Sequence, residues 1–160
     1  MDPNKVVVER APADFSDWEP VRALIVEAFS SMHGRIDPPS SASRLTAVSM
    51  AEDAAKGALL LAKLGGTVVG CVFVRPQNGA LYLGKFAVRA DKHGQGIGRA
   101  LIAAARTEAR TLGLASLELQ TRIELLENHA AFARMGFVRT GETAHPGYDR
   151  PTSVIMRAPA

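Results

Sequence analysis

Three glycines at alternate positions, Gly94, Gly96 and Gly98, mark the part of the sequence best suited to chemistry. They follow an apolar strand-like run over residues 86–88 and open directly onto a helix expected from about residue 96 to residue 112. Glycine lets the backbone turn tightly and approach a ligand, and the first turn of a helix leaves its N–H groups without partners. These donors and the positive end of the helix dipole favour binding of an anion such as a pyrophosphate.

Two common phosphate motifs do not fit this run. The spacing differs from the G-x-G-x-x-G of dinucleotide-binding folds, and Glu118, about 20 residues further on, lies within a predicted strand and not at its end. A P-loop is also excluded, because no Gly-Lys-Ser or Gly-Lys-Thr follows the glycines.

The run from His93 to Gly98 resembles motif A of the GNAT superfamily of N-acetyltransferases, Gln/Arg-x-x-Gly-x-Gly/Ala, with His93 in place of Gln or Arg. Residues 81–88 are similar to the family's fourth strand, and residues 132–137 to its late helix that ends in Gly-Phe. The resemblance implies acetyl-coenzyme A (acetyl-CoA) as cosubstrate, with its pyrophosphate on the turn and its pantetheine arm near Asn128. The implied acetyl-CoA-binding residues are Phe86, Ala87, Val88, His93, Gly94, Gln95, Gly96, Ile97, Gly98, Arg99, Asn128 and Phe132.

The resemblance also implies how the reaction is catalysed. Backbone N–H groups of Phe86 and Val88, freed by a bulge in the strand, would stabilise the charge that develops on the thioester carbonyl oxygen. The amine must lose a proton, yet the acid that the family often carries on its fourth strand is replaced here by Gly84-Lys85. Glu118 and Glu124 are the expected substitutes, with a solvated or salt-bridged role as the alternative for both.

The CoA thiolate must then be protonated, and the tyrosine that the family commonly uses for this step is replaced by Phe132. Tyr148, beside His145 and Asp149, is the expected substitute, with Tyr82 as a further candidate and unaided departure of the thiolate as a third route. The alternative for the segment around Tyr148 is a turn whose composition serves the backbone alone.

The composition favours one globular domain over residues 1–160. Hydrophobic residues make up 47% and charged residues 22%, with a net charge of +3 and a pI of about 9.4, which suits an acidic ligand. We expect no nucleic-acid partner, because Lys and Arg do not cluster, and no membrane association, because no apolar run approaches the ~18 residues of a span. The start of the chain lacks the features of a signal peptide, so the cytoplasm is the expected location.

Cysteine and histidine provide no sign of a metal site. Cys71 is the single cysteine and lies in an apolar run, where it is expected to be a small buried hydrophobic residue. The four histidines, His33, His93, His129 and His145, lack the spacings that place metal ligands together.

The element order is predicted to be β-α-α-β-β-β-α-β-α-β-β, which is the GNAT order and implies an α/β fold of the α+β type with a mixed, mostly antiparallel sheet of about seven strands. Strands are expected over residues 5–10, 58–64, 67–74, 80–89, 114–120, 137–141 and 153–157, and helices from Trp18 to Phe29 and over residues 44–56, 96–112 and 127–135. The polar loop over residues 31–43 is expected either to line the acceptor site or to be a surface connection.

The sequence therefore predicts an acetyl-CoA-dependent N-acetyltransferase that acts on a primary amine by direct attack on the thioester. Two alternatives stay open: an acyl-CoA-binding module with impaired catalysis, suggested by Phe132 and Gly84-Lys85, and a non-catalytic interaction domain. A homodimer through the final strands is also compatible with the sequence.

Overall fold

The computed structural model describes residues 5–160 and contains one seven-stranded sheet. Its strands are β1 (Val7–Arg10), β2 (Ala58–Leu64), β3 (Thr67–Gln77), β4 (Ala80–Val88), β5 (Ser116–Arg122), β6 (Val138–Thr143) and β7 (Ser153–Pro159). They lie in the order β1-β2-β3-β4-β5-β7-β6, and every neighbouring pair is antiparallel except β4 and β5. The predicted fold class and the predicted mixed, mostly antiparallel sheet are thus confirmed.

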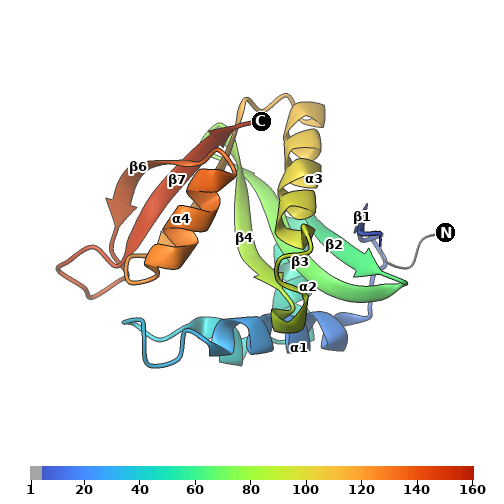
Figure 1. Cartoon of the computed structure of the whole chain (residues 1–160), viewed down its shortest axis with the longest axis horizontal. Coiled ribbons are helices and arrows are strands. Elements are labelled where there is room, and N and C mark those ends of the chain that lie inside the picture. The colour runs from blue at the N-terminus through green and yellow to red at the C-terminus, as the bar shows by residue number, and fades with distance from the viewer. Residues whose placement is uncertain (1–4) are drawn as a thin grey trace.

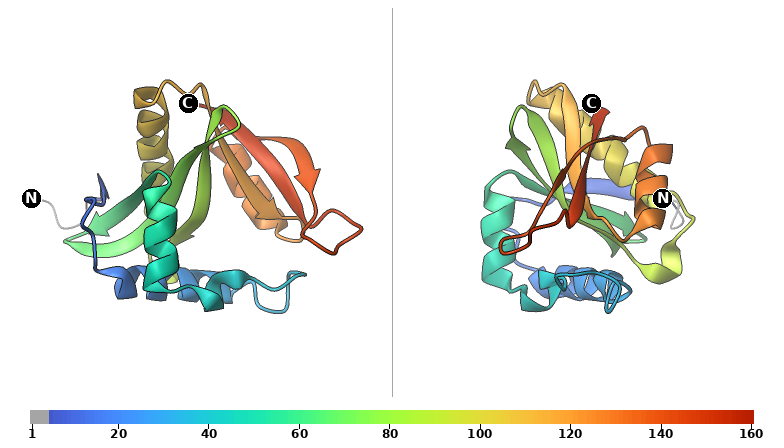
Figure 2. Two further views of the ribbon diagram at one scale, coloured as in Figure 1. Left: turned by 180° about the vertical axis from the view of Figure 1, so that it is seen from behind. Right: turned by 90° about the vertical axis from the view of Figure 1, so that its left-hand side faces the viewer.

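Four helices cover the two faces of this sheet. They are α1 (Trp18–Ser30), α2 (Ala47–Ala55), α3 (Ile97–Thr111) and α4 (Leu126–Arg134). Figures 1 and 2 show α1 and α2 on one face and α3 and α4 on the other. No helix within residues 5–160 has the length and apolar character needed to cross a membrane.

Strand β2 shows why the sheet is covered on both sides. Its run Ala-Leu-Leu-Leu-Ala is buried throughout, as expected for a strand with no solvent-facing side. Leu60 packs with the core on the α3 side, whereas Leu59 and Leu61 pack with the core on the α1 side. The alternation of side chains along a strand therefore supplies both hydrophobic cores from one continuous apolar run.

Several predicted element bounds differ from the structure, and two of the differences have clear local reasons. The second helix begins at Ala47 and not at Arg44, because Thr46 and Ser49 form a reciprocal capping box and residues Ser41–Arg44 form a separate 3-10 turn. The fifth strand begins at Ser116 and not at Leu114, since the chain leaves α3 through Gly113, whose φ is +73°.

The sheet opens between its two parallel strands. Strands β4 and β5 pair only from Leu81 to Leu83 and from Leu117 to Leu119. Beyond this short ladder they separate, and Figure 1 shows β4 and the β6–β7 pair diverging toward α1, which lies across the lower edge of the view. The chain thereby forms a V-shaped opening in the middle of the sheet, and the start of α3 lies on one side of it.

Candidate functional site at the opening between β4 and β5

The glycine-rich turn presents a row of unpaired backbone donors. Gly94 and Gly96 have φ values of +82° and +80°, and Gly96 is the left-handed N-cap of α3 without a side-chain cap. The first hydrogen bond of the helix runs from the N–H of Ala100 to the carbonyl of Gly96 at 3.0 Å. Within the described part of the chain, the backbone N–H groups of residues 93–99 donate no hydrogen bond to any protein group. This arrangement fits the expectation of an anion-binding turn.

Two further glycines hold this turn against the sheet. A Cβ on Gly70 of β3 would lie 2.9 Å from Cγ2 of Ile97, so the start of α3 sits directly on that strand. A Cβ on Gly98 would lie 3.3 Å from Cζ of Phe86. The close approach of α3 to β3 and to Phe86 fixes the position of the free donors relative to β4.

Strand β4 carries the bulge that the resemblance implied. Val72 of β3 faces two residues of β4, Lys85 and Phe86, and Lys85 adopts a φ of +51°. Lys85 is held there by its Nζ, which donates to Oδ2 of Asp53 at 2.5 Å. Because backbone groups alternate along a strand and Ala87 pairs with Cys71 of β3, the N–H groups of Phe86 and Val88 point toward the side from which β5 has separated.

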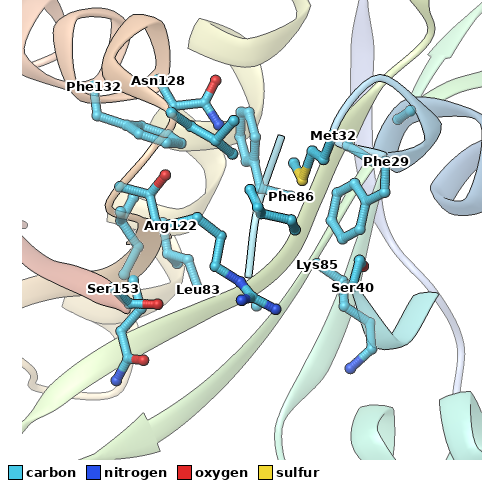
Figure 3. A pocket seen from close by; sticks show the side chains of 18 of the residues that line it. Phe29, Met32, Ser40, Leu83, Lys85, Phe86, Arg122, Asn128, Phe132 and Ser153 are labelled. Carbon is cyan, nitrogen blue, oxygen red and sulfur yellow. The ribbon is translucent and has the colours of Figure 1, made fainter. Parts of the chain in front are cut away.

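A cavity of about 480 Å³ lies at the opening of the sheet. Its wall is built from α1 and the loop that follows it, the bulged part of β4, the end of β5, and α4. Figure 3 shows Phe29 and Met32 on one side of the space and Asn128 and Phe132 on the other, with Phe86 between them. Phe132 packs edge-on against Phe86 and Phe137, which anchors α4 to the strand.

Arg122, the last residue of β5, extends into this cavity (Figure 3). Its guanidinium donates to the carbonyl oxygens of Pro38 at 2.7 Å and Pro39 at 3.4 Å. Burial lowers the pKa of the Arg122 guanidinium, whereas the nearby Glu124, Tyr148 and Asp37 raise it. The side chain remains a cation at neutral pH, because an arginine pKa lies far above 7.

His145 lines the cavity from the turn between β6 and β7. Its backbone N–H donates to Oγ1 of Thr152 at 2.9 Å, and its ring Nδ1 contacts the same oxygen. Thr152 is fully buried, and its hydroxyl donates to the carbonyl of Thr143 at 3.4 Å. Burial is the main cause that lowers the pKa of His145. The charge of Arg122 lowers this pKa further, whereas the charge of Glu124 raises it. The imidazole is therefore neutral at pH 7.

The loop over residues 31–43 is tied to the β6–β7 turn through Asp37. Its carboxylate accepts hydrogen bonds from Tyr148 Oη at 2.7 Å and from the Arg150 guanidinium at 2.5 Å, and its N–H donates to Oε2 of Glu124 at 3.0 Å. The hydrogen bond to Asp37 raises the pKa of Tyr148. Ile36 and Ser40 of this loop line the cavity, so the loop forms part of the wall.

The structure brings together only part of the predicted site. Phe86, Ala87, Val88, His93, Asn128 and Phe132 line the cavity, and Gly94, Gln95, Gly96, Ile97, Gly98 and Arg99 form the adjacent turn. The side chain of Ile97 is buried against β3, so only its backbone is available to a ligand.

The three residues predicted to be catalytic lie outside the cavity wall. Glu118 is 8% exposed and accepts a hydrogen bond from Nε of Arg157 at 2.9 Å on the adjacent strand. Glu124 holds the loop through Oε2, and its buried Oε1 has no hydrogen-bond partner within residues 5–160. Tyr148 donates to Asp37. All three side chains thus have other contacts, and the cavity wall contains Arg122 and His145 in their place.

Only a weak sequence signal points to these two residues. Arg122 follows the expected strand, and its approach to the cavity depends on the loop around Pro38, which lies 84 residues earlier. His145 is recognisable in the sequence as a neighbour of Tyr148 and as a histidine without metal-ligand spacing, and neither feature predicts a place in the cavity wall.

Cys71 is fully buried, as expected, and burial raises the pKa of its thiol to about 12. It therefore cannot supply a thiolate nucleophile near neutral pH. Within the described residues, no three His, Cys, Asp or Glu side chains are grouped so that they could hold a metal ion.

Comparison with known proteins identifies the class. The model of the acetyltransferase (GNAT) family matches residues 18–137, which span helices α1 to α4 and strands β2 to β5. An IAA acetyltransferase from Azospirillum brasilense is 32% identical over 102 residues, which are 62% of this chain and 66%, just under two thirds, of that relative. The chain therefore belongs to the acetyltransferase (GNAT) family.

Solved structures share the same fold. An IAA acetyltransferase from Bacillus cereus matches with a TM-score of 0.70 and 21% identity, covering 98% of this chain and 100% of that one. The PaiA N-acetyltransferase of Thermoplasma acidophilum, solved in complex with coenzyme A, matches with a TM-score of 0.80 and 12% identity, covering 98% and 99% of the two chains. At these identities the likeness concerns the fold.

Proposed function

We propose that this protein transfers an acetyl group from acetyl-CoA to a primary amine by direct attack of the amine on the thioester. The observation that carries the proposal is the placement of the unpaired N–H groups of residues 93–99 next to the cavity that opens between β4 and β5. Membership of the GNAT family and the coenzyme A complex of a structural neighbour support the same chemistry.

The acetyl-CoA side of the site consists mainly of backbone groups. A Cβ on Gly94 or Gly96 would meet no protein atom within 4 Å, so the donors of this turn are accessible to a pyrophosphate. From there the pantetheine arm would pass between β4 and α4, close to Asn128 and Phe132. The N–H groups of Phe86 and Val88 would then donate to the thioester carbonyl oxygen as negative charge develops on it.

His145 is the group best placed to accept the proton of the amine. The hydroxyl of Thr152 has one donor and two acceptor sites, and these are satisfied when it accepts from the N–H and the Nδ1–H of His145 and donates to Thr143. The proton then resides on Nδ1, and Nε2 carries a free lone pair on a ring that lines the cavity. A neutral histidine held in this tautomer can act as a general base.

The reaction balances with these groups alone. The ammonium form of the acceptor first loses a proton to solvent. The free amine nitrogen then forms a bond to the carbonyl carbon while the bond from that carbon to sulfur breaks, and the thiolate leaves. His145 Nε2 takes the second proton that the nitrogen loses and passes it to solvent. Because Tyr148 is engaged with Asp37, the thiolate leaves without this tyrosine as its acid, which an ordinary thiol pKa near 8.5 permits.

The experiment that tests this function is a two-substrate assay. Purified protein is incubated with acetyl-CoA and a panel of primary amines, and free thiol and acetylated amine are both measured. We expect thiol and product to form in equal amounts and only when both substrates are present. Binding of acetyl-CoA without turnover of any amine would instead support the alternative of an acyl-CoA-binding module.

A further inference from the structure

The cavity wall has basic side chains but no acidic ones among the described residues. Within residues 5–160, the cavity wall contains the cations Lys85 and Arg122 and the histidines His93 and His145, but no aspartate or glutamate. Lys85 is neutralised by Asp53 at 2.5 Å. Arg122 forms no ion pair with a described residue, and the Glu124 and Asp37 carboxylates influence it only from a greater distance. A polyamine or an aminoglycoside would therefore meet net positive charge and find no carboxylate on this wall.

Arg122 is oriented so that part of its guanidinium remains available. The carbonyls of Pro38 and Pro39 accept from the two terminal nitrogens, which fixes the plane of the group. A guanidinium has five N–H donors, so further donors remain for a ligand in the cavity. Their planar, forked arrangement matches the two oxygens of a carboxylate.

The rest of the acceptor side is apolar. Ala28, Phe29, Met32 and Ile36, from α1 and the loop after it, face the cavity, and Leu125 adds to the wall near Arg122. Figure 3 shows Arg122 extending toward the side on which Phe29 and Met32 lie. An acceptor seated here would place an anionic group on Arg122 and an apolar group against these side chains.

We propose that the acceptor is an amine that also bears a carboxylate on an apolar skeleton, as in an apolar amino acid, and that Arg122 binds this carboxylate. The inference rests on the proposed acetyltransferase function and specifies its substrate class. With the carboxylate on Arg122, the amine of such a molecule remains in the same cavity as His145 and the β4 bulge. Arg122 acts here as a specificity-determining residue and takes no proton.

The test compares matched acceptors. The rate of thiol release is measured with phenylalanine and phenylalaninamide, and with leucine and leucinamide, at a saturating concentration of acetyl-CoA. We expect kcat/KM to be roughly 10- to 100-fold higher for the acid than for the amide, as for loss of a charged hydrogen-bonding partner. The amide has the less basic amine and so more of the reactive free base, which makes a preference for the acid a stringent result.

The variant Arg122→Gln removes the charge, and Arg110→Gln, on the exposed surface of α3, is the control with the same change in charge. The ratio of kcat/KM for acid and amide is compared within each protein, because any shift of the loop at Pro38 would affect both acceptors alike. We expect the ratio to fall by about tenfold or more in Arg122→Gln and to stay unchanged in Arg110→Gln. The KM for acetyl-CoA should be the same in all three proteins.

Two kinds of failure can be told apart. If amines are acetylated but the ratio is the same with and without Arg122, or if spermidine is preferred to every carboxylate-bearing amine, this inference is wrong and the acetyltransferase function stands. If the protein neither binds acetyl-CoA in a calorimetric titration nor releases thiol with any amine, the proposed function is wrong, and the inference is overturned with it.

Discussion

A glutamate in the turn before α3 should weaken acetyl-CoA binding and lower the stability of the fold, and a matched control can separate these two effects. Gly96 has a φ of +80°, and a Cβ there would meet no protein atom within 4 Å. The variant Gly96→Glu therefore suffers backbone strain without a steric clash, a cost of about 1–2 kcal/mol for a residue other than glycine in this conformation. For a protein of this size, this cost corresponds to a fall in Tm of about 2–8 °C.

The hairpin turn between β2 and β3 provides a matched control. Gly66 has a φ of +82° and likewise no neighbour within 4 Å of an added Cβ. The variant Gly66→Glu should lose the same stability, because its strain and its new charge are the same. The two variants differ only in whether the carboxylate lies beside the proposed pyrophosphate site.

The effect on binding follows from electrostatics. Two like charges about 5 Å apart repel by roughly 3 kcal/mol at an effective dielectric constant of about 20, and solvent exposure reduces this to about half. The Kd of acetyl-CoA should therefore rise more than about tenfold in Gly96→Glu and remain unchanged in Gly66→Glu. Calorimetric titration gives the Kd values, and thermal unfolding monitored by circular dichroism gives the Tm values. Equal Kd values in the two variants would refute the assignment of the pyrophosphate to this turn.

Three other predictions concern individual side chains. Replacing His145 with Asn should lower kcat/KM by about 100-fold and leave the Kd of acetyl-CoA unchanged. It should also remove from the acidic limb of the pH–rate profile the ionisation that the lowered pKa of His145 places below about 6.5, so that only the ionisation of the acceptor amine remains; persistence of the lower ionisation would exclude His145 as the base. The buried thiol of Cys71, with its pKa raised to about 12, should react with iodoacetamide at pH 8 about 10³-fold more slowly in the folded protein than in urea, and comparable rates would contradict its burial. Tyr148→Phe removes the hydrogen bond to Asp37 and should raise the KM for the amine a few-fold, by loss of about 0.5–1 kcal/mol, with kcat retained; a large loss of kcat would instead identify Tyr148 as the acid that protonates the thiolate.

Local sequence patterns predicted the elements well because their causes are local. The glycine turn, the apolar alternation of the strands and the glycine that follows α3 each act within a few residues, so they can be recognised without the tertiary structure. The same holds for the acetyl-CoA side of the site, whose donors are backbone groups of one continuous segment. The error at Arg44 arose where a 3-10 turn and a capping box set the start of α2, and the error at Leu114 arose where the chain leaves α3 through Gly113.

The acceptor side could not be predicted in this way, because it is assembled from distant segments. Asp37 contacts Tyr148 and Arg150 across more than 110 residues, and Arg122 contacts the loop at Pro38 across 84. Glu118 shows the same difficulty. Both faces of β5 are covered, so the sequence does not reveal that this glutamate faces Arg157 of the neighbouring strand and not the cavity.

The most direct test of the central claim is a calorimetric titration of the unaltered protein with acetyl-CoA, followed by the same titration with S-acetylpantetheine, which lacks the pyrophosphate and the 3′-phosphoadenosine attached to it. The account predicts saturable binding of one acetyl-CoA per chain and binding of S-acetylpantetheine that is weaker by at least about tenfold, because the charge-assisted hydrogen bonds to the start of α3 are missing. The absence of acetyl-CoA binding, or equal affinity for the two thioesters, would contradict it.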